Sequence, residues 1–154
     1  QGPAAQGGAV PLQPVVDRVS RAFARMPAAA HLAWRVEIPM ELASAAEEGD
    51  LVELLGVLLD NAAKWARSEV RIGAHARDGL VSLTVEDDGP GIPPQDRRAA
   101  LARGVRLDPE RSGTGLGLSI AGDIAAAYGG EIRLDESRLG GLRVVVTWPL
   151  HAVT

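Results

Sequence analysis

Two segments of alternating apolar and polar residues, 70–76 and 80–86, lie on either side of the tripeptide Arg77-Asp78-Gly79. Alternation with a period of two is the pattern of a half-buried β-strand. Asp-Gly favours the tight turn that joins two antiparallel strands, because both residues tolerate positive φ angles. The pattern therefore predicts a β-hairpin, which constrains the whole fold because it fixes two neighbouring strands of one sheet.

The segment before this hairpin has the period of a helix. Between Asp50 and about Trp65, apolar residues recur along one side of a helix. They are Leu51, Leu54, Leu55, Leu58, Leu59 and Ala62. Two more helices are predicted, one over 14–25 with prolines near both ends and one over 116–128 before Gly129-Gly130.

Further strands are predicted at 34–38, where Pro39 ends the alternation, and at 131–134 and 142–150 around the turn Leu139-Gly140-Gly141. Helices and strands that each have one apolar face pack as layers. The expected fold class is α/β: a two-layer sandwich in which a mixed sheet of about five strands is covered on one face by three helices.

Composition limits the kind of protein. The chain has 154 residues, of which 46% are hydrophobic, as in one ordinary soluble domain. A net charge of -4 argues against duplex nucleic acid or an anionic membrane as a partner. The lack of cysteine excludes disulfides, and no apolar run is long enough to span a membrane. We expect a linker at 1–10 and one cytoplasmic domain at 11–154, without direct membrane contact.

Three segments carry residues suited to binding a nucleotide. Asp87 to Pro93 follows a predicted strand, and its carboxylate can accept a hydrogen bond from an amine while its glycines let the backbone approach a ligand. Ser112 to Leu118 opens a helix whose N-H groups attract phosphate. Asp60 to Trp65 supplies an amide oxygen and an ammonium group. Each pattern alone also fits a surface turn or a solvated charge, but the three together indicate a nucleotide pocket.

These segments resemble the N, G1 and G2 boxes of the catalytic ATP-binding domain of sensor histidine kinases, and the resemblance spans roughly 11–149. That domain, with its Bergerat ATP-binding fold, belongs to a wider family with gyrase B, the Hsp90 chaperones and MutL. The stretches 57–65, 87–93 and 139–141 are most similar to PhoQ-type kinases. The resemblance implies ATP and Mg²⁺ as cofactors.

The resemblance also implies roles for single residues. Asp87 would bind the adenine amino group, and Asn61 would be the metal ligand. Lys64 would reach a phosphate, and Trp65 replaces the usual tyrosine near the base or ribose. The other nucleotide-binding positions would be Gly89, Gly91, Ile92, Arg103, Arg106, Arg111, Gly113, Thr114, Gly115, Leu116, Gly117 and Leu118. The three arginines fall in a predicted loop at 102–113, the lid of the family, and which of them contacts phosphate stays open.

Two residues depart from the family's pattern. Val57 lies one helical turn before Asn61, where these kinases have a second asparagine and gyrase-type relatives have a glutamate that activates water. Because valine can neither ligate magnesium nor take a proton, gyrase-like hydrolysis is disfavoured. Leu101, at the end of a short helix predicted at 94–101, replaces the usual phenylalanine of the F box but keeps an apolar anchor.

The expected function is to bind ATP-Mg and to donate the γ-phosphate to a histidine on a separate domain. His31, His75 and His151 lack the helical His-Glu or His-Asp context of such a phosphoacceptor. The implied partners are the dimerisation and phosphoacceptor domain of the same inner-membrane kinase and then a response regulator. Three alternatives stay open: a serine kinase of the anti-sigma type, an ATPase like gyrase B or MutL, and a degenerate nucleotide-binding module.

Overall fold

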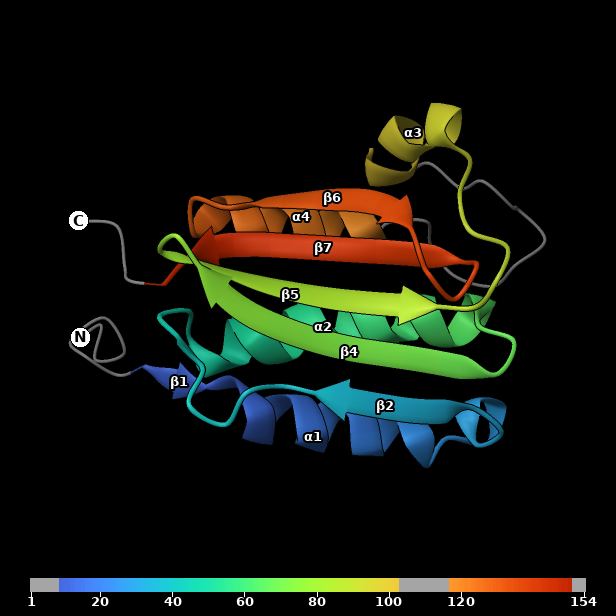
Figure 1. Cartoon of the computed structure of the whole chain (residues 1–154), viewed down its shortest axis with the longest axis horizontal. Coiled ribbons are helices and arrows are strands. Elements are labelled where there is room, and N and C mark those ends of the chain that lie inside the picture. Colours follow the sequence, from blue (N-terminus) through green and yellow to red (C-terminus); the bar gives the residue numbers. More distant parts are fainter. Residues whose placement is uncertain (1–8, 103–116, 151–154) are drawn as a thin grey trace.

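The computed structural model describes residues 9–102 and 117–150. Its elements, with η for 3-10 helices, are β1 (Val10–Pro11), α1 (Leu12–Ala24), η2 (Pro27–Ala29), β2 (Ala33–Glu37), β3 (Ala43–Ser44), α2 (Glu48–Trp65), β4 (Glu69–Arg77), β5 (Leu80–Asp87), η3 (Pro94–Asp96), α3 (Arg97–Leu101), α4 (Gly117–Ala127), β6 (Glu131–Glu136) and β7 (Leu142–Pro149). Five strands form one sheet in the order β2-β4-β5-β7-β6. Figure 1 shows α1, α2 and α4 on one face of that sheet, which confirms the predicted two-layer sandwich.

The sheet is mixed, as expected. Strand β2 pairs in parallel with β4, and the other neighbours in the sheet are antiparallel. The predicted hairpin is confirmed, with Arg77 opposite Leu80 and positive φ angles of 54° at Asp78 and 78° at Gly79. Positive φ at both turn residues is the geometry that Asp-Gly tolerates. From the hairpin, β5 runs through the middle of the sheet and ends at Asp87.

The core lies between the sheet and α2. The predicted apolar stripe is buried along its whole length, and Leu55 and Leu59 have no exposed surface. Each such leucine contributes roughly 1.5–3 kcal/mol through burial. Helix α2 packs between α1 and α4 and against β5. Among residues 9–102 and 117–150, no helix combines the length and apolar character needed to cross a membrane.

A second, two-stranded sheet was not predicted. Strand β1 pairs antiparallel with β3, so that Val10, at the end of the expected linker, lies opposite Ser44. Two-residue strands are too short to show alternation, which is why the sequence pattern missed them. The Ser44 hydroxyl accepts hydrogen bonds from Trp148 Nε1 at 2.6 Å and from Ala46 N at 2.9 Å. These bonds tie the connection between β3 and α2 to the end of β7.

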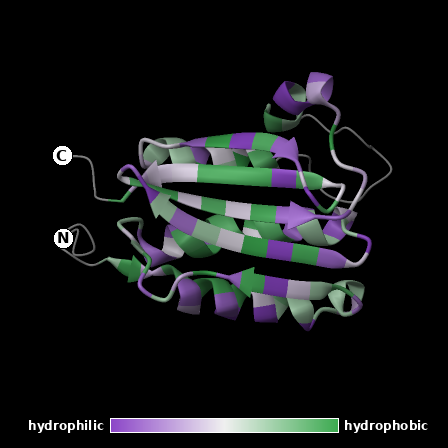
Figure 2. Ribbon diagram, in the orientation of Figure 1, coloured by the Kyte–Doolittle hydropathy of each residue, from purple (hydrophilic) through white to green (hydrophobic). Residues whose placement is uncertain are grey.

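The sheet face without helices carries a row of charged residues. Hydrophilic and hydrophobic residues alternate along β4 in Figure 2, because successive side chains of a strand point to opposite faces. One row crosses all five strands in register and consists of Arg35, Arg71, Glu86, Arg143 and Asp135. At the end of β5, Asp87 therefore points toward the helices and Glu86 points toward the opposite face of the sheet.

Candidate nucleotide-binding site

The described parts of the three predicted segments lie along the carboxyl-terminal half of α2. A Cβ added to Gly89 would lie 2.3 Å from the Trp65 carbonyl oxygen, so the segment after β5 passes directly over the last residue of α2. A Cβ added to Gly117 would lie 3.6 Å from Val57 Cγ1, so the start of α4 faces the same helix one turn before Asn61. Figure 1 shows the ends of β5 and β6 and the start of β7 on this side of the molecule.

Asp87 is a buried carboxylate with one oxygen fixed by the backbone. Its side chain is 2% exposed and continues the inward-facing series of β5. Its Oδ1 accepts hydrogen bonds from Gly89 N at 2.8 Å and from Leu142 N at 3.3 Å. Within the described residues, no hydrogen bond reaches Oδ2. The geometry therefore leaves Oδ2 available as a hydrogen-bond acceptor.

Burial raises the pKa of Asp87 above the usual aspartate range, against the opposing effect of the two backbone N-H groups. A carboxyl group whose pKa is higher in the folded state than in the unfolded state stabilises the fold at pH values below the unfolded-state pKa. This contribution to stability is lost as the pH rises through the folded-state pKa. We expect Asp87→Asn to melt at the same or a higher temperature than the wild type near pH 7, and the difference to shrink toward about pH 4. Melting curves across this range test the expectation, which fails if the difference grows on acidification.

The neighbouring Asp88 fastens the connection between α2 and β4. Its Oδ1 accepts hydrogen bonds from Arg67 N at 2.8 Å, Ser68 N at 3.0 Å and Glu69 N at 3.2 Å, and its Oδ2 accepts from Ser68 Oγ at 2.5 Å. Burial opposes ionisation, but the Ser68 hydroxyl and the backbone N-H groups hold the pKa of Asp88 far below its usual range. Asp88 thus joins the segment after β5 to the connection between α2 and β4.

The turn between β6 and β7 forms another wall of the site. A Cβ added to Gly141 would lie 2.3 Å from Asp87 Oδ1, 2.5 Å from the Asp87 carbonyl oxygen and 2.6 Å from Gly89 N. Gly91, with φ of 71°, would place a Cβ 3.3 Å from the Gly141 carbonyl group. The sequence predicts a turn at Gly140-Gly141 and a similarity of 139–141 to PhoQ-type kinases, but no contact with Asp87. The structure shows that this turn touches the buried carboxylate.

The residues of α2 lie beside this wall. Asn61 and Trp65 are both partly buried. Lys64 Nζ forms an ion pair of 3.1 Å with Asp60 Oδ2, and its side chain is 33% exposed. An exposed pair of this kind is worth about 1 kcal/mol or less, so it is a weak competitor for a phosphate group. Ile92 packs against the core and Leu118 belongs to it, so both of these side chains support the site from behind.

Part of the predicted site lies outside the described residues: Arg103, Arg106, Arg111, Gly113, Thr114, Gly115 and Leu116, with nearly all of the predicted lid. Leu101, at the end of α3, is partly buried against the core, as expected of an apolar anchor. His31 and His75 are exposed, and His151 is also outside the described residues.

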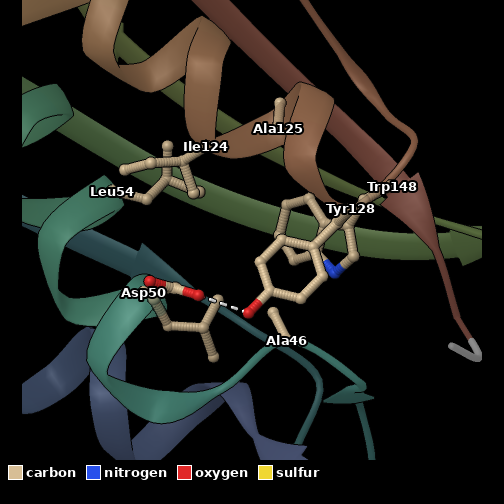
Figure 3. A pocket seen from close by; sticks show the side chains of 8 residues that line it. Ala46, Asp50, Leu54, Ile124, Ala125, Tyr128 and Trp148 are labelled. Carbon is tan, nitrogen blue, oxygen red and sulfur yellow. Dashed lines mark hydrogen bonds between the residues drawn. The ribbon is translucent and has the colours of Figure 1, made fainter.

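A small hollow at the other end of α2 is not part of this site. Figure 3 shows it between the start of α2, the end of α4 and β7, with the Tyr128 hydroxyl bonded to Asp50. The same hydroxyl accepts from Glu47 N at 3.0 Å. Asp50 precedes Asn61 by eleven residues, which corresponds to about 16 Å along a helix. The contacts there fasten α2 to α4.

Comparison with known proteins agrees with this geometry. Residues 46–152 match the family described as histidine kinase-, DNA gyrase B-, and HSP90-like ATPase. The chain therefore belongs to this family, and the resemblance inferred from the three segments is confirmed.

Its relatives include sensor kinases. It is similar to sensor protein kinase CarS of Pseudomonas aeruginosa, with 54% identity over 121 residues that make up 79% of this chain and 27% of CarS. It is similar to PhoQ of Escherichia coli, with 38% identity over 136 residues, 88% of this chain and 28% of PhoQ. The chain thus spans about a quarter of the length of these relatives. The solved structure of the mycobacterial sensor histidine kinase MprB has a TM-score of 0.82 and 27% identity, and the match covers 94% of this chain and 98% of that one.

Proposed function

We propose that this chain binds ATP with Mg²⁺ and presents the γ-phosphate to a histidine on the dimerisation and phosphoacceptor domain of a sensor kinase. The observation that carries the proposal is the buried Asp87, whose Oδ1 is held by two backbone N-H groups while Oδ2 faces no protein donor among the described residues. Membership of an ATPase family supports ATP as the nucleotide. Sensor kinases among the relatives support transfer to histidine.

The adenine would lie against Asp87, with its amino group donating to Oδ2. Gly89, Gly91 and Gly141 let the backbone segments around Asp87 pack closely against one another, because none of them has a side chain. The ribose and phosphates would then extend along the end of α2, past Trp65, toward the start of α4 at Gly117. The N-H groups at the start of a helix, and its positive dipole end, favour phosphate.

Magnesium fits this site only together with the nucleotide. The described residues contain no group of three or more His, Cys, Asp or Glu side chains that could hold a metal ion. Asn61 offers one amide oxygen, and phosphate oxygens and waters would complete the shell, a mode that magnesium accepts readily. The bound ion would neutralise charge on the triphosphate, and Lys64 would contribute a second positive charge.

Transfer of a phosphoryl group depends mostly on positioning and charge stabilisation. This domain therefore needs no nucleophile of its own, and the histidine of the phosphoacceptor domain supplies it. In the same proposal the phosphoryl group passes on to a response regulator. The domain lies in the cytoplasm as part of an inner-membrane kinase.

Phosphorylation of the parent kinase with γ-labelled ATP tests the proposal. The expected product is a phosphoprotein that loses its label in acid and keeps it in base, as a phosphohistidine does. An acid-stable product would support the serine kinase alternative, and steady ATP hydrolysis by the isolated chain would support a gyrase-like ATPase. Absence of nucleotide binding would contradict the proposal and favour a degenerate module.

A substitution at Val57 tests the proposed magnesium position near Asn61. It is partly buried against the core and lies one turn before Asn61. Val57→Asn should tighten magnesium-dependent ATP binding by about threefold to tenfold, because a second amide oxygen joins that of Asn61. The variant should also melt a few degrees lower, since a polar group replaces a partly buried methyl.

Titrations with ATP in the presence and absence of magnesium measure the effect of Val57→Asn. Val57→Ala is the matched control, because it removes the same packing without adding an amide. A large loss of stability with no gain in affinity would show that Val57 serves the core and that the metal site lies elsewhere.

A further inference from the structure

Two buried polar side chains, Glu86 and Ser137, lie next to the candidate site and have no role in it so far. Glu86 is 7% exposed and Ser137 is 4% exposed. Glu86 directly precedes Asp87 in β5 but points to the other face of the sheet, and Ser137 begins the turn between β6 and β7. A buried carboxylate and a buried hydroxyl both need hydrogen-bond partners.

Ser137 bonds to Glu86 and to its own turn. Its Oγ donates to Glu86 Oε1 at 3.0 Å and accepts from Leu139 N at 2.9 Å. Its backbone N donates to the Gly141 carbonyl oxygen at 2.8 Å, and its carbonyl oxygen accepts from Gly140 N at 3.0 Å. Within the described residues, the side-chain hydrogen bonds of this turn all pass through the Ser137 hydroxyl.

The far end of the same turn reaches Asp87. Gly141 packs against Asp87 so closely that a side chain would overlap Oδ1, and Leu142 N donates to Oδ1 at 3.3 Å. The contacts therefore form a closed ring around the end of β5. The ring runs from the Glu86 carboxylate on one face of the sheet, through Ser137 and the turn, to the Asp87 carboxylate on the other face.

We propose that Ser137 and Glu86 are positioning residues for the adenine-binding carboxylate. They hold the turn between β6 and β7 against Asp87, so that Leu142 N keeps Oδ1 engaged and Oδ2 stays directed at the amino group of the base. This inference rests on the proposed function, because it assigns the reason for adenine selectivity at the same site. The long Leu142 bond is the weakest bond in the ring and would be lost first if the turn relaxed.

Ser137→Ala removes the hydroxyl that closes the ring. ATP affinity should fall about tenfold, the typical effect of one buried hydrogen bond. Inosine triphosphate carries a 6-oxo group in place of the 6-amino group, so it lacks the amine donor that Oδ2 accepts from in ATP. Its affinity should change by less than about twofold. The ratio of the two affinities separates loss of orientation at Asp87 from a general loss of structure.

Calorimetric titrations of the 154-residue chain with ATP-Mg and with inosine triphosphate-Mg measure this ratio, and melting temperatures are recorded beside them. Ser137→Thr keeps the hydroxyl and should stay near wild type. Glu86→Gln keeps the Oε1 acceptor and should also stay near wild type, whereas Glu86→Ala should reproduce the loss. Ser82→Ala is the matched control for a serine substitution, because Ser82 lies on the same face of β5 as Glu86.

The inference is overturned if folded Ser137→Ala binds ATP as the wild type does, or if both nucleotides weaken equally. If Ser137→Ala does not fold, the contrast between Glu86→Gln and Glu86→Ala decides, and equal ATP affinity in those two variants overturns the inference. A wild-type chain that binds no ATP would overturn the proposed function, and this inference with it. If the wild type binds ATP and the variants bind it equally well, the inference is overturned but the proposed function is not.

Discussion

Replacing Asp87 with asparagine should lower the affinity for ATP by about a hundredfold while the fold stays intact. Loss of a buried, charge-assisted hydrogen bond accounts for roughly 1.5–3 kcal/mol of such an effect. The fold itself should tolerate the change, because burial already disfavours the charged form of Asp87. The variant therefore separates binding from stability.

The backbone makes this substitution more damaging than a simple loss of charge. Gly89 N and Leu142 N both donate to Oδ1, so the asparagine amide must turn its carbonyl oxygen toward them. Its NH₂ group then takes the place of Oδ2 and faces the amino group of adenine. Two donors meet, and neither is satisfied. Inosine triphosphate offers a carbonyl oxygen there and should bind the variant better than ATP does.

Titration of Asp87→Asn with both nucleotides measures this reversal. Asp78→Asn is the matched control: it makes the same chemical change in the hairpin turn, where the side chain is 86% exposed. The control should bind ATP as the wild type does. A folded Asp87→Asn with unchanged ATP affinity would remove Asp87 from the site.

Gly141→Ala should both weaken ATP binding by more than about tenfold and destabilise the chain by roughly 1–3 kcal/mol. The new methyl group would lie 2.3 Å from Asp87 Oδ1 and 2.6 Å from Gly89 N. These neighbours are a buried carboxylate and backbone, so relief requires the turn and the end of β5 to move apart. Either movement displaces Oδ2 from the base.

Gly140→Ala provides the comparison within the same turn. Its Cβ would meet nothing within 4 Å, but its φ of 102° strains any residue other than glycine. It should cost about 1–3 kcal/mol of stability with little change in ATP affinity. Thermal melting and calorimetry on both variants make the test, and equal losses of affinity would show that the turn's conformation matters rather than the contact with Asp87.

The architecture was predictable where local pattern and tertiary packing agree. The apolar stripe of α2 and the hairpin at Asp78-Gly79 each follow from a pattern of residues that are close in the sequence. Both elements appear in the structure within two residues of the expected bounds. Asp87 was predictable as a candidate because a carboxylate at a strand end followed by glycines is also a local pattern. The small β1–β3 sheet was not predictable, because two residues carry no period.

The supporting residues of the site could not be predicted from local pattern. Asp88 bonds to residues 19 to 21 positions earlier, and Ser137 bonds to Glu86, 51 positions earlier. Nothing near Gly141 in the sequence indicates that its missing side chain makes room for Asp87. Such requirements arise only when distant strands meet, so a single sequence carries their residues but not their pairing.

The contacts of Gly89 with the end of α2, and of Gly141 with Asp87, join backbone to backbone between elements that the core already holds in place. The proposed site for the base is consequently preorganised: its walls are assembled when the sheet folds, so that binding a base there would require little ordering of the chain. In the proposed function, selectivity for the base is then determined by contacts that form when the chain folds. A substitution at the phosphate end of the proposed site, such as one at Val57, therefore leaves the preference for adenine unchanged.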